Sequence, residues 1–142
     1  TLRTLYAAGV DIPRPLRQAG RAILMEYVGD AESAAPPLNK VALPEDEAPA
    51  LFDRLIRNVA RCLACHCVHA DLSPFNVLYW QGAPKLIDFP QAVDPRFNHN
   101  ACTLLERDVA NLCHYFARYG TQTDPLSLAD HLWSRYLEGD LR

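Results

Sequence analysis

The stretch His69-Ala70-Asp71-Leu72-Ser73-Pro74-Phe75-Asn76 lies between a segment with helical periodicity and two short apolar runs. Twelve residues after Asn76, the second of these runs ends at Asp88. Asp71, Asn76 and Asp88 therefore stand at the open ends of short elements, where polar side chains can converge on one site without being buried. Each of them alone is more often a turn or cap residue, so the prediction rests on their joint spacing.

This spacing is typical of phosphoryl transfer. The reaction needs a carboxylate that accepts the proton of the attacking hydroxyl, and it needs Mg²⁺, which prefers hard oxygen ligands such as carboxylate and amide groups. Protein kinases place an Asn five residues after the catalytic-loop Asp and a second Asp after the next hairpin. The interval from Asp71 to Asn76 is five residues, and that from Asn76 to Asp88 leaves room for a short hairpin.

The surrounding pattern predicts an α+β fold of a mostly helical body with a short β-hairpin, preceded by one or two strands left from a small N-terminal sheet. Apolar residues spaced by four indicate an amphipathic helix, and two apolar runs around Gln81-Gly82-Ala83 indicate a hairpin. We expect, in chain order, a helix end over residues 1–8, a buried strand over 22–28, a connecting segment over 30–44, a helix from about 45 to 65, hairpin strands over 77–80 and 84–87, a helix over 104–119 and a last helix capped by Asp124-Pro125. Pro13 and Pro15 exclude a helix between the first two elements.

Composition excludes several classes of protein. The chain has 142 residues, 49% of them hydrophobic, which suits one globular domain. A net charge of -3 gives no global attraction to nucleic acid or to an acidic membrane. No apolar run approaches the roughly 20 residues that span a bilayer. The five cysteines suggest reduced thiols in the cytosol, so we expect a cytoplasmic protein.

The chain resembles the RIO kinases, an atypical branch of the protein kinase superfamily. The resemblance runs from about residue 2 to residue 119, and the stretch Ile87-Asp88-Phe89-Pro90-Gln91, where other kinases have Asp-Phe-Gly, is its most specific part. The other segments that carry it are Met25-Glu26-Tyr27-Val28-Gly29, the stretch from His69 to Asn76, Ala92-Val93 and Leu105-Glu106-Arg107-Asp108-Val109.

The resemblance implies a role for each matching residue. Asp71 would be the catalytic base, and Asn76 and Asp88 would bind Mg²⁺ or Mn²⁺. The backbone of Met25, Glu26 and Tyr27 would form a hinge that binds the adenine of ATP. Residues 1–28 would be the remnant of an N-terminal kinase lobe, and residues 29–142 the C-terminal lobe.

The same resemblance implies a serine/threonine kinase or ATPase that uses ATP with Mg²⁺. Its phosphate acceptor would be a hydroxyl of a protein or a small molecule, and several relatives serve small-subunit ribosome maturation. No membrane partner is expected, and the sequence carries no direct signal for nucleic acid.

Two departures from the family pattern stand out. Neither a Gly-rich loop nor a Val-Ala-x-Lys strand precedes Met25, and Lys40 follows the hinge. Because these parts of the phosphate site are missing and the chain does not begin with Met, we expect a truncated catalytic-lobe fragment that alone binds ATP weakly. No signal peptide is visible. The second departure is Ala70, which stands where the family usually has Gly. If this position needs a left-handed backbone, Ala there costs about 1 kcal/mol.

Four alternatives remain open. Aminoglycoside and choline kinases share the His-x-Asp-x4-Asn and Ile-Asp-Phe patterns. An inactive pseudokinase or interaction module would also lack half of the nucleotide site. The run Cys62-Leu63-Ala64-Cys65-His66 matches a c-type haem attachment pattern. Zinc binding is possible because Cys62, Cys65, Cys67, His66 and His69 are close in sequence.

Overall fold

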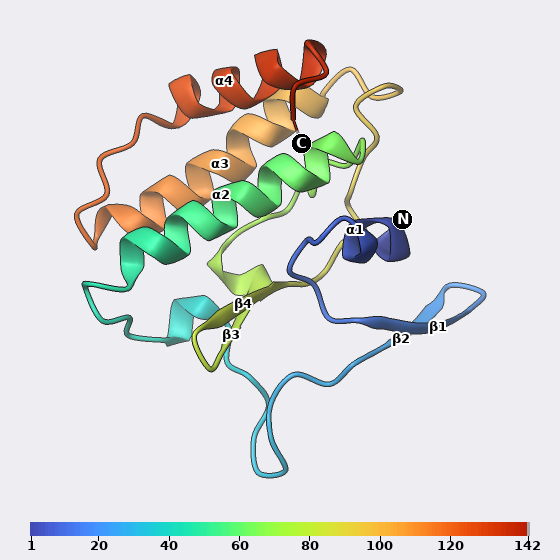
Figure 1. Cartoon of the computed structure of the whole chain (residues 1–142), viewed down its shortest axis with the longest axis vertical. Helices are drawn as coiled ribbons and strands as arrows, with labels where there is room; N and C mark the ends of the chain where they lie inside the picture. Colours follow the sequence, from blue (N-terminus) through green and yellow to red (C-terminus); the bar gives the residue numbers. More distant parts are fainter. Residues whose placement is uncertain (142) are drawn as a thin grey trace.

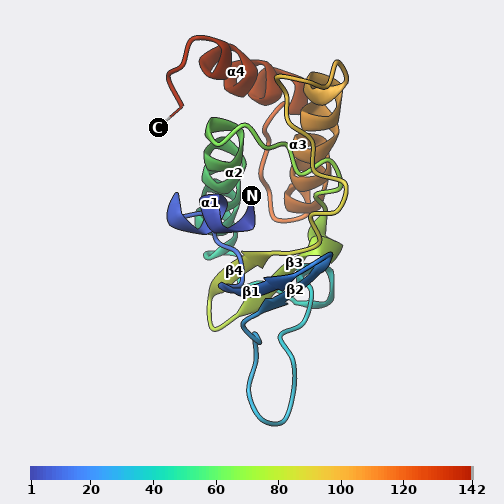
Figure 2. The same ribbon diagram turned by 90° about the vertical axis from the view of Figure 1, so that its right-hand side faces the viewer.

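The computed structural model describes residues 1–141. Its elements, in chain order, are α1 (Leu2–Ala7), β1 (Pro15–Ala19), β2 (Ala22–Met25), the 3₁₀ turn η1 (Leu38–Lys40), α2 (Ala48–Ala64), the 3₁₀ turn η2 (Pro74–Asn76), β3 (Val77–Trp80), β4 (Ala83–Leu86), α3 (Ala101–Ala117) and α4 (Pro125–Leu137). The α+β class is confirmed, with helices on one side of the molecule and two small hairpins on the other (Figures 1 and 2).

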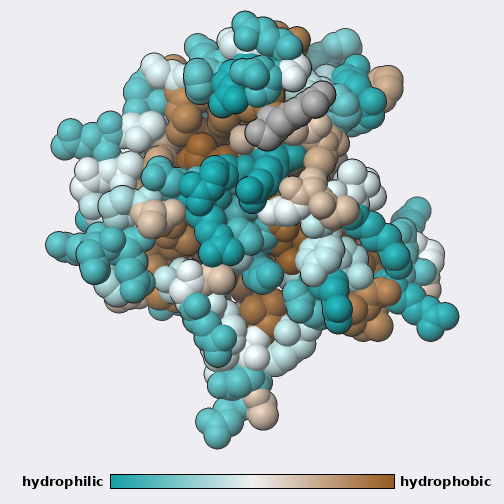
Figure 3. All heavy atoms as spheres, in the orientation of Figure 1, coloured by the Kyte–Doolittle hydropathy of each residue, from teal (hydrophilic) through white to brown (hydrophobic). Residues whose placement is uncertain are grey.

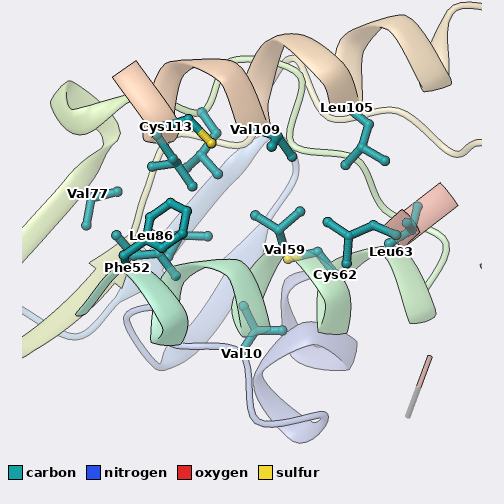
Figure 4. Close-up of a cluster of buried hydrophobic side chains, with 14 of the residues drawn as sticks. Val10, Phe52, Val59, Cys62, Leu63, Val77, Leu86, Leu105, Val109 and Cys113 are labelled. Atoms are coloured by element: carbon teal, nitrogen blue, oxygen red, sulfur yellow. The ribbon is translucent and has the colours of Figure 1, made fainter. Parts of the chain in front are cut away.

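The core lies in the helical part. Helices α2 and α3 run side by side, and α4 packs on α3 (Figures 1 and 2). The four apolar residues of α2 that are spaced by four, Leu51, Leu55, Val59 and Leu63, are all buried, as the periodicity predicts. Figure 4 shows their neighbours from α3 and from the β3–β4 hairpin in the same cluster.

The β3–β4 hairpin closes the core beneath the helices. Its strands pair antiparallel from Val77 opposite Leu86 to Trp80 opposite Ala83, and both Val77 and Leu86 are buried. The turn residues Gln81 and Gly82 both have positive φ, which is the conformation that two-residue hairpin turns favour. The predicted hairpin is therefore confirmed, with its second strand of four residues shifted by one residue toward the N-terminus.

The strand predicted over residues 22–28 is present in part, but the prediction that it is buried is wrong. Strand β2 exists but ends at Met25, and all four of its residues are exposed. Within residues 1–141 it pairs with β1, whose position was not predicted, because Pro13 and Pro15 indicated only that no helix forms there. Pro15 is tolerated as the first residue of β1 because a strand's outer edge needs no N–H donor. An apolar run alone does not reveal whether anything packs over it.

A narrow-necked loop connects β2 to η1. The backbone N–H of Ala35 donates to Val28 O (2.9 Å), and that of Asp30 donates to Ser33 O (3.0 Å). Gly29 lies at the neck with φ of +139°, and a Cβ there would lie 2.5 Å from Ser33 O. The loop projects from the body of the molecule (Figures 1 and 2).

The face in Figure 3 is largely hydrophilic, with hydrophobic side chains showing between the polar ones. Over the described part of the chain, none of the helices combines the length and the apolar character needed to cross a bilayer.

Candidate active site

His69 joins the Asp71 loop to the segment before Asp88. The backbone N–H of Asp71 donates to His69 Nδ1 (3.2 Å), so the ring proton belongs on Nε2, which donates to Ile87 O (2.8 Å). The ring is buried and packs on Phe89 at 4.5 Å between centroids. His69 is thus a structural histidine that connects the two acidic segments of the site.

Asn76 makes the second connection. Its Nδ2 donates to Asp71 O (2.8 Å) and, over 3.4 Å, to Asp71 Oδ2. Its backbone oxygen accepts the N–H of Ile87 (2.9 Å), the residue before Asp88. Because the amide nitrogen is engaged by Asp71, the side-chain oxygen Oδ1 is the atom of Asn76 that suits a cation.

Asp71 and Asp88 are both exposed, whereas Asn76 is half-buried. Asp88 has φ of +67°, a left-handed conformation that Asp tolerates better than most residues. The structure therefore joins Asn76 directly to Asp71, and joins Asn76 to Ile87, the residue before Asp88. Carboxylate and amide oxygens that are open to solvent are the hard donors that Mg²⁺ binds with several waters retained.

Helix α3 holds the same loop from its other side. The carboxylate of Asp108, 1% exposed, accepts the N–H groups of Ala70 (2.8 Å) and Leu72 (3.0 Å). Asn111 Nδ2 donates to Leu72 O (2.8 Å), and Arg107 donates to Ala70 O. Asp71 thus lies between two residues whose backbone groups are anchored to α3.

Neither Asp108 nor Asn111 was expected to have a role in the site. A signal for Asp108 was present, because it lies three residues after Leu105 and four before Leu112, on the apolar face of the helix. A carboxylate on a buried face requires partners. Burial raises the pKa of Asp108, and the two backbone N–H groups offset only part of that rise.

Ala70 has φ of +71°, so the position does require a left-handed backbone, and Ala carries the strain expected there. Its Cβ is buried.

The hinge residues lie in a separate network. The N–H of Glu26 donates to Arg14 O (2.9 Å), and the N–H of Arg14 donates to Glu26 Oε1 (2.8 Å). Tyr27 is exposed, and its hydroxyl donates to Asp30 O (3.0 Å). Within residues 1–141, no hydrogen bond joins Met25, Glu26 or Tyr27 to Asp71, Asn76 or Asp88.

The haem and zinc alternatives find no support in the geometry. Cys62 and Cys67 are each 3% exposed, at the end of α2 and just after it. In the part of the chain that the structure describes, no three His, Cys, Asp or Glu side chains form a group that could hold a metal ion.

Comparison with known proteins identifies relatives along most of the chain. The family model described as "RIO domain" matches residues 1–128. The RIO-type serine/threonine-protein kinase Rio1 of Thermoplasma acidophilum is 33% identical over 132 residues, which cover 92% of this chain and 67% of that protein. Human serine/threonine-protein kinase RIO1 is 34% identical over 116 residues, covering 81% of this chain and 20% of its own length. The Schizosaccharomyces pombe kinase rio1 is 33% identical over 119 residues and is covered over 24% of its length. The chain thus spans between a fifth and two thirds of these relatives.

Proposed function

Because this chain belongs to the RIO domain family, whose relatives named above are serine/threonine-protein kinases, we propose that it carries the catalytic loop of an ATP- and Mg²⁺-dependent phosphotransferase. One observation carries the proposal. Asp71 is linked directly to Asn76, and both are linked through Ile87 to the segment that presents Asp88.

In this proposal the carboxylate of Asp71 accepts the proton of the acceptor hydroxyl as the γ-phosphoryl group is transferred in line. The bond from Asn76 Nδ2 to Asp71 Oδ2 orients that carboxylate. Asn76 Oδ1 and the carboxylate of Asp88 would hold Mg²⁺, which neutralises charge on the phosphate oxygens when bound. Anchoring by Asp108 and Asn111 fixes the loop, so that Asp71 need not be ordered during each turnover.

The nucleotide base would meet the backbone of Met25, Glu26 and Tyr27. Since the Glu26 N–H already donates to Arg14 O, adenine would meet the other backbone groups of this segment. Residues 1–28 would then correspond to an N-terminal lobe portion, and residues 29–142 to the C-terminal lobe. The acceptor would be a hydroxyl of a protein or of a small molecule.

The direct test is transfer of ³²P from Mg·ATP to a panel of protein and small-molecule acceptors, with the Thermoplasma relative as the positive control for the assay. We expect Asp71→Asn to lower the transfer rate by roughly 10²-fold or more, as the loss of a general base does. Asp53→Asn, which changes an exposed carboxylate on α2, is the matched control and should leave the rate unchanged. A rate for Asp71→Asn equal to that of the unaltered chain would contradict the proposal.

Asp88→Asn separates metal binding from adenine binding. We expect this change to raise the Mg²⁺ concentration needed for half-maximal transfer, and to leave the affinity for adenosine, which carries no phosphate, unchanged. A metal titration and calorimetry with adenosine measure the two effects. Equal loss of both would contradict the role of Asp88 as a metal ligand.

Calorimetry on residues 1–142 tests how much of the nucleotide site this chain holds. The two lysines are Lys40 and Lys85, and neither precedes the hinge. We therefore expect Mg·ATP to bind more weakly than micromolar, because no Gly-rich loop and no preceding lysine cradle the phosphates. Micromolar binding would overturn this expectation.

A further inference from the structure

Three thiols gather where α2 ends and the chain turns toward the catalytic loop. His66 adopts a left-handed conformation with φ of +58°. The N–H of Cys67 then donates to Cys62 O (2.9 Å), and the N–H of His66 donates to Leu63 O (2.9 Å). These are the two bonds of a Schellman motif, which brings the side chains at the positions of Cys62 and Cys67 together.

The burial of both thiols agrees with this contact. Cys62 and Cys67 are each 3% exposed, and they line one small void together with His69 and Asp108. Burial, and then the neighbouring thiols, raise the pKa of Cys67 to about 11 and that of Cys62 well above its ordinary value. The pair is therefore protonated at neutral pH and does not react with oxidants by itself at an appreciable rate.

Cys65 differs from this pair in its access to solvent. It is half-buried and lines an open cavity of about 390 Å³ together with Arg61, His66 and Tyr136. A small oxidant can enter such a cavity and reach the Cys65 thiol, whereas the buried thiols of Cys62 and Cys67 are shielded from it. Cys65 is also close to the buried pair, because its N–H donates to Cys62 O (3.0 Å) across the last turn of α2.

We propose that Cys65 is the peroxide-reactive thiol of this chain, and that its oxidation ends in a disulfide between Cys62 and Cys67. These cysteines would form a redox modification site just before the catalytic loop, since Cys67 lies two residues before His69. The oxidant is a hydroperoxide such as hydrogen peroxide. Formation of the bond does not rest on the proposed phosphotransferase function, so the two can fail separately.

The chemistry proceeds in three balanced steps. The thiolate of Cys65 attacks one peroxide oxygen, the O–O bond breaks, and Cys65 sulfenic acid and hydroxide form. The thiol of Cys62 loses its proton and attacks the sulfenic sulfur, which releases hydroxide and, with that proton, water, and leaves a Cys62–Cys65 disulfide. The thiol of Cys67 then loses its proton and attacks the sulfur of Cys62, which forms the Cys62–Cys67 bond and returns Cys65 as a thiolate. Two thiols are oxidised in total and one peroxide is reduced to two waters.

Peptide mapping tests the proposal on the unaltered chain. The reduced protein is treated with graded hydrogen peroxide, alkylated in denaturant and digested with trypsin, which gives a single peptide of residues 62–85 holding all three thiols. We expect the number of alkylated thiols in this peptide to fall from three to one, with Cys65 keeping the label. Cys102 is the internal control, because it is also half-buried and its described hydrogen bond is to Glu106 rather than to a thiol. It lies on the separate peptide 97–107 and should form no internal disulfide.

Two variants assign the roles. In Cys65→Ser we expect Cys62 and Cys67 both to stay alkylatable at peroxide concentrations that oxidise the unaltered chain. In Cys67→Ser we expect the reaction to stop at a Cys62–Cys65 bond. Formation of the Cys62–Cys67 bond in Cys65→Ser at the unaltered rate would remove Cys65 as the reactive thiol. Three labels persisting on peptide 62–85 after Cys102 has been oxidised, or a final bond that includes Cys65 in the unaltered chain, would overturn the proposal.

Discussion

Asp108 faces the core of the protein, yet both of its carboxylate oxygens accept backbone N–H groups of the catalytic loop. Asp108→Asn keeps the shape of the side chain but replaces one acceptor oxygen with an N–H donor. One backbone N–H then faces another donor in a buried site, and an unsatisfied buried group costs about 1–3 kcal/mol. We expect the free energy of unfolding in urea to fall by that amount.

Asp53→Asn is the matched control for this measurement, because Asp53 is exposed on α2 and a surface change of this kind usually costs less than about 0.5 kcal/mol. Equal stability of Asp108→Asn and the control would mean that the loop does not depend on this carboxylate.

Ala70 presents a balance of opposing effects. Replacement by Gly relieves a left-handed strain of about 1–2 kcal/mol. Two effects act against this gain in stability. The loss of a buried methyl group costs about 0.8 kcal/mol, and the greater conformational entropy of Gly in the unfolded chain costs about 0.5–1 kcal/mol. We expect Ala70→Gly to change the free energy of unfolding by less than about 1 kcal/mol, measured by denaturant titration. A loss above about 2 kcal/mol would show that the Cβ of Ala70 supports the loop.

At the scale of elements, Asp11 ties the segment between α1 and β1 to the rest of the fold. Its carboxylate receives two bonds from Arg54 (2.8 and 2.9 Å) and one from Asn58 Nδ2 (2.8 Å), and its backbone oxygen accepts the N–H of Leu86. Asn58 is fully buried and also accepts the Asp11 N–H (2.8 Å). One residue thereby connects α2, β4 and the N-terminal segment.

These hydrogen bonds of Asp11 make the free energy of unfolding depend on pH. Burial alone would raise the pKa of Asp11, but the hydrogen bonds from Arg54 and Asn58 outweigh it, and the pKa is lowered. The ionised carboxylate therefore contributes stability above its unfolded-state pKa, and this contribution is lost as the pH falls through the lower folded-state value. We expect Asp11→Asn to cost about 1–2 kcal/mol at pH 7, since Arg54 is partly exposed, and the difference from the unaltered chain to shrink below about pH 4. Urea titrations at pH 7, 5 and 3 measure it, and a difference independent of pH would contradict the assignment.

The elements show what a sequence can predict. The helix α2 and the hairpin β3–β4 were predicted because their apolar periodicity coincides with burial. The position of β1 was not predicted, because Pro15 excludes a helix there without indicating a strand. The burial of β2 was misjudged because burial depends on what packs over a strand. In the candidate active site, too, local sequence patterns were predictive and long-range contacts were not. Asp71, Asn76 and Asp88 were identified by local spacing, whereas Asp108 and Asn111 act through contacts 36 to 39 residues away in the chain.

At the scale of the whole molecule, stability should be uneven. The strands β1 and β2 contact mainly each other, and Ile23 and Leu24 are 42% and 60% exposed. Helices α2 and α3 instead enclose the core. Because exposed hydrogen bonds with few packed neighbours open most readily, we expect backbone amides of β1–β2 to exchange with deuterium much faster than those of α2 and α3.

Hydrogen exchange followed by mass spectrometry of peptides measures this difference, and the β3–β4 hairpin is the control because it has the same strand type but a buried face. Protection of β1–β2 equal to that of β3–β4 would mean that the first hairpin opens only with the whole molecule.

The closed neck at Gly29 has a consequence for protein engineering. Because the N–H of Ala35 donates to Val28 O, the residues between these two form a closed loop. They therefore add little to the distance that the chain covers from β2 to η1. Loop tips of this kind accept insertions because their ends are already held at a fixed separation. The tip is also held by Asp30, whose Oδ1 accepts the N–H groups of Glu32 and Ser33 (2.9 Å each), so a reporter peptide inserted there would break these bonds and leave the bond between Ala35 and Val28 to hold the neck. A side chain at Gly29 itself would force the neck apart.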